Sequence, residues 1–403
     1  MTYILAALVV LFSADVQAQQ RELRIRAARV FDGAGQLLTN ATVVVTGSTI
    51  AAIESSSSRT PDIDLGQSTL LPGLIDVHSH IGWHFGPGGK YEPRGGTPAQ
   101  EVLYAAENAY LTLMAGFTTI QSPGQPVDID LREAIARGVL PGPRILTSIV
   151  QITPMTGTPV ELRQTVRDLK RHRADVVKII DAVGGPAGVR TMTREQWEAL
   201  CGESKAQGLR TMVHAQTSES VRSAVEAGCT QIEHGVGLDE AALTFMADRG
   251  VYFDPNVGLV MQNYLRNKAR FLGVGDYDEE SFASMEHTMR VNAALIKKAV
   301  ATPGLKLVLG SDAVAGAHGR NADELVERVR QGGQKPVDAI VSATSLAAES
   351  LGLEKSLGRI APGFQADIIA VDGNPAVDIG VLTRVTFVMR DGKVYKHSSG
   401  DGR

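Results

Sequence analysis

Residues 73–80 of the chain read Gly73-Leu74-Ile75-Asp76-Val77-His78-Ser79-His80. This apolar, partly β-branched run follows a Pro-Gly turn signal and predicts a buried β-strand. Because side chains two apart on a strand point to the same side, His78 and His80 are expected to face the same way. Two neutral imidazoles at a strand end suit a divalent metal ion, although so short a motif also arises by chance on exposed edges.

From Pro72 to about Ser356 strands alternate with helical stretches, and this motif is the first of the strands. Thr193 and Gln196 predict a capping box at the start of one helix, over 193–207. The segment 256–301 is helical in period and is expected to lie over the active-site mouth. A helix is expected near 100–115, and seven further strands at 116–120, 144–149, 174–180, 209–214, 230–234, 250–254 and 305–312. Eight strands with room for a helix after each predict an α/β fold, a (β/α)₈ TIM barrel over residues 72–356.

Short β-type segments flank the predicted barrel at both ends of the chain. Residues 41–45 are β-branched near the N-terminus, and residues 366–371 and 385–390 have the same texture near the C-terminus. Chain termini often lie close in space. Residues 19–71 and 357–403 are therefore expected to pair into one small β-sandwich.

Residues 1–18 have the pattern of a secretion signal. The run Ile4 to Phe12 is apolar but too short to span a bilayer comfortably, and Val16-Gln17-Ala18 is a small-residue cleavage site. The first three residues carry no Lys or Arg, which leaves a membrane anchor or a cytosolic apolar arm as alternatives. We expect a periplasmic or secreted protein with no stable membrane insertion after signal removal.

Composition excludes some functional classes. The chain has 403 residues and a net charge of −4, so nothing in its charge favours nucleic-acid binding. Cys201 and Cys229 lie far apart in sequence and make no disulfide framework. Each is expected to be a small buried residue.

Polar residues end several of the predicted strands. In a (β/α)₈ barrel the active residues lie at the C-terminal ends of the strands. These residues are His78 and His80 on the first strand, Lys178 on the fourth, His214 on the fifth, His234 on the sixth and Asp312 on the eighth. Their types suit one or two zinc-like ions.

Lys178 is the unusual member of this set. It shares a strand face with Val176 and Ile180 and is expected to point inward, unless only its stem is buried and its amine reaches solvent. Burial lowers the pKa of a lysine. A neutral amine can add carbon dioxide and become a carbamate, which is a carboxylate-like ligand able to bridge two metals.

The sequence resembles the amidohydrolase superfamily from about Arg24 to Val394. Within the superfamily, the sequence most resembles the imidazolonepropionase-like branch, which contains prolidase-type Xaa-Pro dipeptidases. It also resembles mycotoxin and pesticide amidases with a carboxylated lysine. The resemblance rests on residues 71–80, Gly116-Phe117-Thr118-Thr119, Gly142-Pro143-Arg144, Val177-Lys178, Ile232-Glu233-His234-Gly235, Gly310-Ser311-Asp312 and Gly363-Phe364-Gln365-Ala366-Asp367.

The resemblance implies a metal centre with two divalent ions, expected to be zinc, and often a homo-oligomer. His78, His80 and Asp312 would hold the more buried ion and His214 and His234 the more exposed one, with carboxylated Lys178 bridging both. The implied reaction is metal-assisted hydrolysis of a small-molecule amide or peptide, such as an Xaa-Pro dipeptide or an N-acyl amino acid.

Two residues receive catalytic roles in this reading. Asp312 would take a proton from the attacking hydroxide and deliver it to the leaving nitrogen. Tyr252 would donate a hydrogen bond to the substrate carbonyl or carboxylate, unless it is only a half-buried strand aromatic. His84 and His318 are expected near the mouth in surface or supporting roles.

The sequence departs from the dipeptidase pattern in two places. The loop after the third strand, residues 154–159, has no His where dipeptidases of this branch carry one. After the second strand, Gln121-Ser122 stands where these enzymes commonly have Arg-Asp. A cyclic-amide, lactone or aryl-ester hydrolase, including one acting on mycotoxins or other xenobiotics, is therefore the alternative. A solute-binding or structural protein is disfavoured because no metal ligand is missing.

Overall fold

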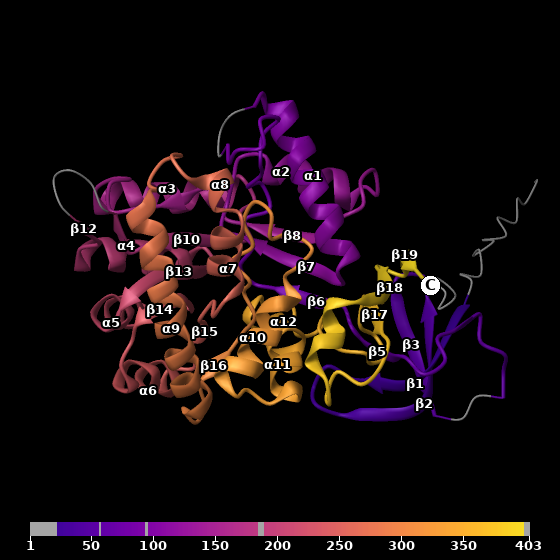
Figure 1. Ribbon diagram of the computed structural model, residues 1–403. Helices are drawn as coiled ribbons and strands as arrows, with labels where there is room; N and C mark the ends of the chain where they lie inside the picture. The colour runs from indigo at the N-terminus through magenta and orange to yellow at the C-terminus, as the bar shows by residue number, and fades with distance from the viewer. Residues whose placement is uncertain (1–21, 56–57, 93–95, 184–188, 399–403) are drawn as a thin grey trace, which may run out of the picture.

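The computed structural model describes residues 22–55, 58–92, 96–183 and 189–398 (Figure 1). The predicted secretion signal at residues 1–18 lies outside these ranges. Within them, no helix has the length and apolar character needed to cross a bilayer. Figure 1 shows an α/β body beside a β-rich lobe that contains strands from both ends of the chain.

The β-rich lobe is one eight-stranded sheet in which the two chain ends pair, as predicted. Its path runs β19-β18-β17-β5-β1-β2-β3, and β4 pairs with β1. The N-terminal strands are β1 (Glu22–Phe31), β2 (Leu37–Thr46), β3 (Thr49–Glu54), β4 (Ile63–Asp64) and β5 (Thr69–Pro72). The C-terminal strands are β17 (Ile368–Val371), β18 (Val385–Arg390) and β19 (Lys393–His397). The strands pair in one continuous sheet, where the sequence predicted a sandwich.

Hydrogen bonds and a shared core join the two ends. β17 pairs antiparallel with β5, so that Ile369 stands opposite Leu71. Fully buried residues from both ends, such as Ile25 and Phe387, pack in one cluster. The β18–β19 turn has positive φ angles at Asp391 (50°) and Gly392 (75°), the backbone that a two-residue hairpin turn requires.

The parallel strands of the α/β body lie in two sheets and follow one another in chain order, while β11 (Ala182–Val183) and β12 (Arg190–Thr191) form a separate antiparallel pair. A three-stranded sheet contains β6 (Leu74–Asp76), β7 (Phe117–Ser122) and β8 (Arg144–Thr147). A six-stranded sheet contains β9 (Gln151–Ile152), β10 (Val176–Ile180), β13 (Arg210–Thr217), β14 (Gln231–Gly237), β15 (Tyr252–Asp254) and β16 (Lys306–Leu307). All eight predicted strands are present, but among the described residues the parallel strands pair in two sheets, not in one closed barrel.

Helices follow the strands as the sequence predicted. The capping box is confirmed, since the Gln196 backbone N–H donates to Thr193 Oγ1 (3.2 Å) at the start of α4. The helices of the body are α1 (Pro98–Met114), α2 (Asp128–Ala136), α3 (Pro159–Arg171), α4 (Arg194–Ala206), α5 (Ser218–Glu226), α6 (Glu240–Asp248), α10 (Ala322–Gly332), α11 (Pro336–Ser342) and α12 (Ser345–Ser350). The predicted helical segment 256–301 contains α7 (Leu259–Arg266), α8 (Lys268–Phe271) and α9 (Glu279–Ala301).

One expectation about the cysteines is wrong. Cys201 on α4 and Cys229, just before β14, form a disulfide with their Cα atoms 5.1 Å apart. Helices α4 and α5 are neighbours in this fold, so a separation of 28 residues in sequence becomes direct contact in space. The bond ties the outer helix layer to the strand that carries His234.

Candidate metal centre

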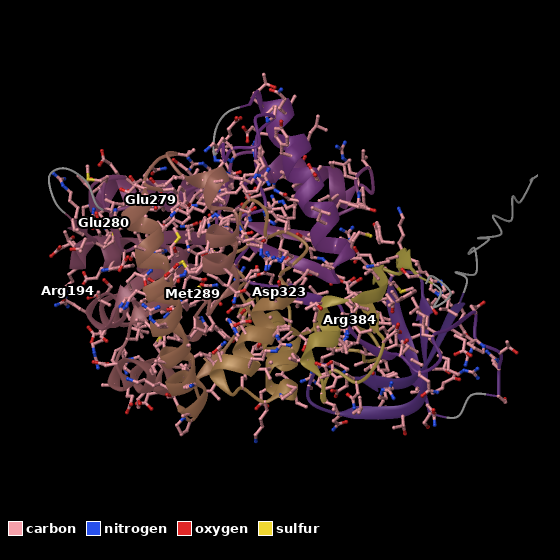
Figure 2. All side chains as sticks on the ribbon, in the orientation of Figure 1. Arg194, Glu279, Glu280, Met289, Asp323 and Arg384 are labelled. Atoms are coloured by element: carbon pink, nitrogen blue, oxygen red, sulfur yellow. A yellow bond between two sulfur atoms is a disulfide. The ribbon has the colours of Figure 1, made fainter. Side chains whose placement is uncertain are left out.

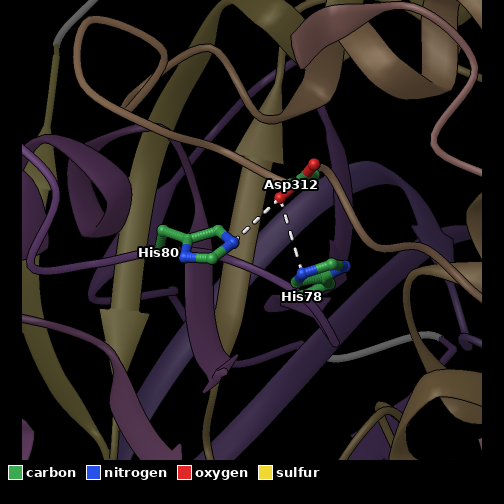
Figure 3. A group of neighbouring side chains, drawn as sticks. All are labelled: His78, His80 and Asp312. Atoms are coloured by element: carbon green, nitrogen blue, oxygen red, sulfur yellow. Dashed lines mark ion pairs between the residues drawn. The ribbon is translucent and has the colours of Figure 1, made fainter. Parts of the chain in front are cut away.

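Two predicted histidine ligands lie against one carboxylate oxygen of a third predicted ligand, Asp312. Asp312 Oδ1 lies 3.4 Å from His78 Nε2 and 3.1 Å from His80 Nε2 (Figure 3). Two ligands of a tetrahedral zinc ion, each about 2.1 Å from the metal, lie roughly 3.4 Å apart. The spacing of these nitrogen and oxygen atoms therefore fits a shared divalent cation.

The other predicted ligands lie beside this group. The ring of His234 lies 5.3 Å from that of His78 and 4.3 Å from that of His214, between centroids. Lys178 is 1% exposed, and its Nζ has no hydrogen-bond partner among the described residues. The structure thus gathers His214 and His234 with the first group, and leaves a buried amine that needs a partner.

The protonation of these side chains also suits metal binding. Burial, together with the charge of Lys178, lowers the pKa of His214 to about 3. Burial and the neighbouring His214 hold the pKa of His234 well below its usual range. Burial likewise lowers the pKa of Lys178, against the carboxylates of Glu233 and Asp312. Neutral imidazoles have the lone pairs that a metal ion requires.

Backbone strain accompanies two of the ligands. His234 has φ 69° and Asp312 has φ 49°, in the left-handed region that residues other than glycine seldom adopt. On a regular strand Glu233 and His234 would point to opposite faces. The turn at His234 lets both side chains approach His78, and such strain is typical of functional sites.

The second nitrogen of His78 faces two carboxylates. His78 Nδ1 lies 2.7 Å from Glu233 Oε2 and 3.5 Å from Asp254 Oδ2. Burial and Lys178 act to lower the pKa of His78, but Glu233 and Asp312 outweigh them and raise it to about 10. These three side chains also lie close enough to hold a cation. Because Nε2 of the same ring faces Asp312, we interpret Glu233 and Asp254 as carboxylates that orient a metal-binding histidine.

Asp76 braces the first strand against the eighth. One carboxylate oxygen accepts from the backbone N–H groups of His78 (3.1 Å) and Ser311 (3.0 Å), and the other accepts from Asn321 Nδ2 (2.7 Å). The His78 carbonyl in turn accepts from the Asp312 N–H at 2.8 Å. This buried residue fixes the distance between the His78 and Asp312 backbones.

A buried ion network behind the centre was not found by sequence reasoning. Arg328 on α10 has 0% exposure, and its Nη2 donates to Asp254 Oδ1 at 2.9 Å. Its Nη1 donates to the Val308 carbonyl (2.7 Å), and its Nε lies 3.4 Å from Glu324 Oε1. Arg328 therefore holds Asp254, which lies against His78. Asp254 ends its strand and was detectable by the strand-end rule, whereas nothing in the sequence around Arg328 marks it.

Tyr252 does not belong to this cluster. It is the first residue of β15, and its hydroxyl donates to Glu349 Oε1 at 2.8 Å, beside Lys306 at the start of β16. Burial and Glu349 raise the pKa of its phenol. The expectation that Tyr252 contacts the substrate is corrected. Tyr252 lies at the N-terminal end of its strand, whereas the candidate ligands lie at the C-terminal ends of the parallel strands.

Most of the remaining candidates have structural partners. His84 is buried and stacks on Tyr104 with 4.1 Å between ring centroids. His318 is buried too, but neither of its ring nitrogens has a hydrogen-bond partner among the described residues. The loop at 154–159 contacts α4, because Gln196 Nε2 donates to the carbonyls of Pro154 (3.1 Å) and Gly157 (3.0 Å). Gln121 donates to the Val77 carbonyl at 3.0 Å and so supports the first strand.

Comparison with known proteins identifies the family. The model of the amidohydrolase family matches residues 69–397. The chain is 25% identical to an ochratoxinase of Aspergillus niger, over 92% of this chain and 86% of that protein. It is 23% identical to an imidazolonepropionase of Deinococcus deserti, over 89% and 90% of the two chains. The crystal structure of a Xaa-Pro dipeptidase with bound methionine superimposes with a TM-score of 0.82 and 29% identity, covering 93% of this chain and 100% of that one.

The chain belongs to the amidohydrolase family, as its fold and its cluster of histidines and carboxylates indicate. Within the superfamily it lies on the side of prolidases and imidazolonepropionases and is related to ochratoxinase. It is a metal-dependent hydrolase that acts on carbon–nitrogen bonds.

We predict that Arg328→Met weakens zinc binding by about tenfold or more, because supporting residues of metal-binding histidines typically contribute that much. It also leaves buried carboxylates unpaired, which costs about 3–5 kcal/mol of stability. Competition with a chromophoric chelator and urea unfolding measure the two effects. Arg330→Met, on the exposed side of the same helix, is the control. Equal zinc affinities for the two variants would contradict the proposed role.

Proposed function

We propose that this protein is a binuclear hydrolase that cleaves the amide bond of small substrates, either dipeptides such as Xaa-Pro or N-acyl amino acids. The observation that carries the proposal is that His78 and His80 both lie against one carboxylate oxygen of Asp312. The rings of His214 and His234 lie alongside this group. The likeness to a Xaa-Pro dipeptidase at 29% identity adds support.

Divalent ions bound there, with zinc expected, supply an activated water and polarise the scissile carbonyl. Asp312 is the proton carrier of the proposal. Burial acts to raise the pKa of Asp312, but the charges of His78 and His80 hold it well below its usual range. An ionised carboxylate beside the reacting atoms can accept a proton from the attacking water and pass it to the leaving nitrogen.

Lys178 is proposed to be carboxylated and to provide the third ligand for the His214–His234 side. Its amine is buried without a hydrogen-bond partner among the described residues, and an unpaired buried ammonium is costly. Burial lowers the pKa of Lys178, which favours the neutral amine that reacts with carbon dioxide. The carbamate replaces a buried cation with an anion that two metal ions can share.

The alternative substrate class is a cyclic amide, a lactone or an aryl ester. One observation favours it: the loop at 154–159 contains no histidine that could meet a dipeptide and instead packs on α4. The ochratoxinase relative shows that this family also includes enzymes named for a mycotoxin. Both classes use the same metal centre.

Turnover on three substrate sets tests the proposed function. We expect the zinc-loaded protein to hydrolyse amides with a free carboxylate, whereas chelator-treated protein does not. Asp312→Asn should keep its metal and lose about 100-fold or more in kcat, because the amide cannot accept the proton. Dipeptides, N-acyl amino acids, and esters with lactones form the three sets. If only the esters and lactones are hydrolysed, the proposed substrate class of amides is wrong. If Asp312→Asn remains active, Asp312 is not the proton carrier.

A second prediction concerns the bridging ligand. We expect Lys178→Ala to lower zinc content, and propionate to restore part of it, because a small carboxylate can occupy the space of the lost carbamate. Elemental analysis and activity with and without the acid are the measurements. Val176→Ala, a truncation on the same face of β10, is the control. Full zinc content in Lys178→Ala without added acid would refute the bridging role.

We also propose that the protein is exported. The apolar run near the N-terminus and the Cys201–Cys229 disulfide support export, since disulfides persist mainly in oxidising compartments. In a Gram-negative host we expect periplasmic protein whose intact mass corresponds to a start near Gln19 and which has no free thiol. A protein that begins at Met1 with two titratable thiols would argue against export.

A further inference from the structure

Aromatic side chains gather where the loop after β6 meets the helices of the segment 256–301. We call this group the aromatic wall; its members are Trp83, Tyr91, Tyr264, Phe271 and Tyr277. Trp83 and Tyr277 remain partly exposed, whereas Phe271 is fully buried. The cluster therefore reaches from the core to the surface.

The wall begins at a metal ligand. The ring of Trp83 lies 4.3 Å from that of His80, between centroids, and 5.4 Å from that of Tyr91. Phe271 then contacts both Tyr91 (5.1 Å) and Tyr264 (4.9 Å). A group bound beside His80 would therefore lie close to the Trp83 ring.

The two segments that form the wall are fastened to each other. The guanidinium of Arg270 lies 3.3 Å from the centroid of the Phe85 ring, and its Nε donates to the Gly89 carbonyl at 2.7 Å. The Tyr91 N–H donates to the Arg270 carbonyl (2.8 Å), and Lys90 Nζ donates to that of Ala269 (2.7 Å). The wall is thus largely preformed, which lowers the entropic cost of binding a ring against it.

The wall also offers a polar group close to the centre. The Tyr277 hydroxyl donates to the Tyr264 hydroxyl at 3.0 Å, and no described residue accepts the Tyr264 proton. Burial, with the charges of Tyr277 and Asp312, holds the pKa of Tyr264 well above its usual range, so the phenol stays protonated. Asn263 Nδ2 donates to the Ala315 carbonyl (2.9 Å) and keeps α7 beside the chain that follows Asp312.

We propose that the aromatic wall is a substrate subsite for a planar aromatic group attached next to the scissile carbonyl, with Trp83 as the stacking residue. The inference rests on the proposed metal centre and narrows its substrates to aromatic acyl compounds. Stacked or tilted ring pairs contribute beyond the area that they bury, and an aliphatic side chain gains nothing comparable from Trp83.

Two hydroxamates separate this subsite from the metal centre. Benzohydroxamate and acetohydroxamate bind metal through the same group and differ in a phenyl against a methyl substituent. With zinc-loaded full-length protein, the ratio of their dissociation constants measures the preference for the ring. We expect Trp83→Leu to reduce this ratio about tenfold, equivalent to ~1.4 kcal/mol of ring contact, and Trp83→Phe to retain most of it.

Trp197 provides the matched control, because it is the other of the two tryptophans and lies buried in the core. Trp197→Phe should leave the ratio unchanged and should make Trp83 the sole tryptophan, whose selectively excited fluorescence benzohydroxamate should quench. Acetohydroxamate affinity equal to wild type in each variant shows an intact, folded metal centre.

An unchanged ratio in Trp83→Leu with normal acetohydroxamate binding overturns the subsite and leaves the proposed function standing. If neither hydroxamate binds the zinc-loaded wild type, the metal centre itself is wrong, and the subsite falls with it.

Discussion

The structure depends on how negative charge is balanced around His78. Asp76, Glu233, Asp254 and Glu324 all have 0% exposure. Buried carboxylates are costly unless they are paired or hydrogen-bonded. Arg328 compensates Asp254 and Glu324, while Glu233 and Asp312 face His78. Lys178 has no hydrogen-bond partner among the residues that the structure describes. Divalent cations at the candidate ligand cluster would supply the positive charge that a dry site of this kind needs, and their binding would then be linked to folding.

The same network reaches the mouth of the site. The carboxylate of Glu324 accepts the backbone N–H groups of Val257, Gly258 and Leu259 at the start of α7. A carboxylate at a helix N-terminus is favourable because it pairs with N–H groups that have no partner inside the helix. Helix α7 carries Tyr264, a member of the aromatic wall. Orientation of a metal ligand and placement of the mouth are therefore set by one buried arginine and its two carboxylates.

The sequence predicted what depends on local pattern. Strand positions follow from apolar runs, and the capping box follows from Thr193 and Gln196 at a helix start. The meeting of His78, His80, His214 and His234 follows from polar residues at the ends of apolar strands. The prediction for Tyr252 was wrong because the rule that active residues lie at strand ends selects Asp254, the last residue of β15.

Contacts between distant segments were beyond that reasoning. Arg328 reaches Asp254 over 74 residues, and the Cys201–Cys229 pair requires helix neighbours that no periodicity reveals. The two separate sheets likewise follow from strand pairing, which a list of strands does not fix.

The candidate ligands at the strand ends and the aromatic wall at the mouth of the site should respond differently to substitution. Changing a ligand or a supporting carboxylate leaves unpaired buried charge and costs several kcal/mol, whereas replacing one ring of the aromatic wall costs about 1 kcal/mol of contact. Substitutions in the aromatic wall should therefore be tolerated better than substitutions in the candidate ligand set. The chain is similar to proteins named for different substrates, a Xaa-Pro dipeptidase at 29% identity and an ochratoxinase at 25%. Because the mouth is built from loop and helix segments outside the strands, substrate preference must be argued from its own residues, beginning with Trp83 beside His80.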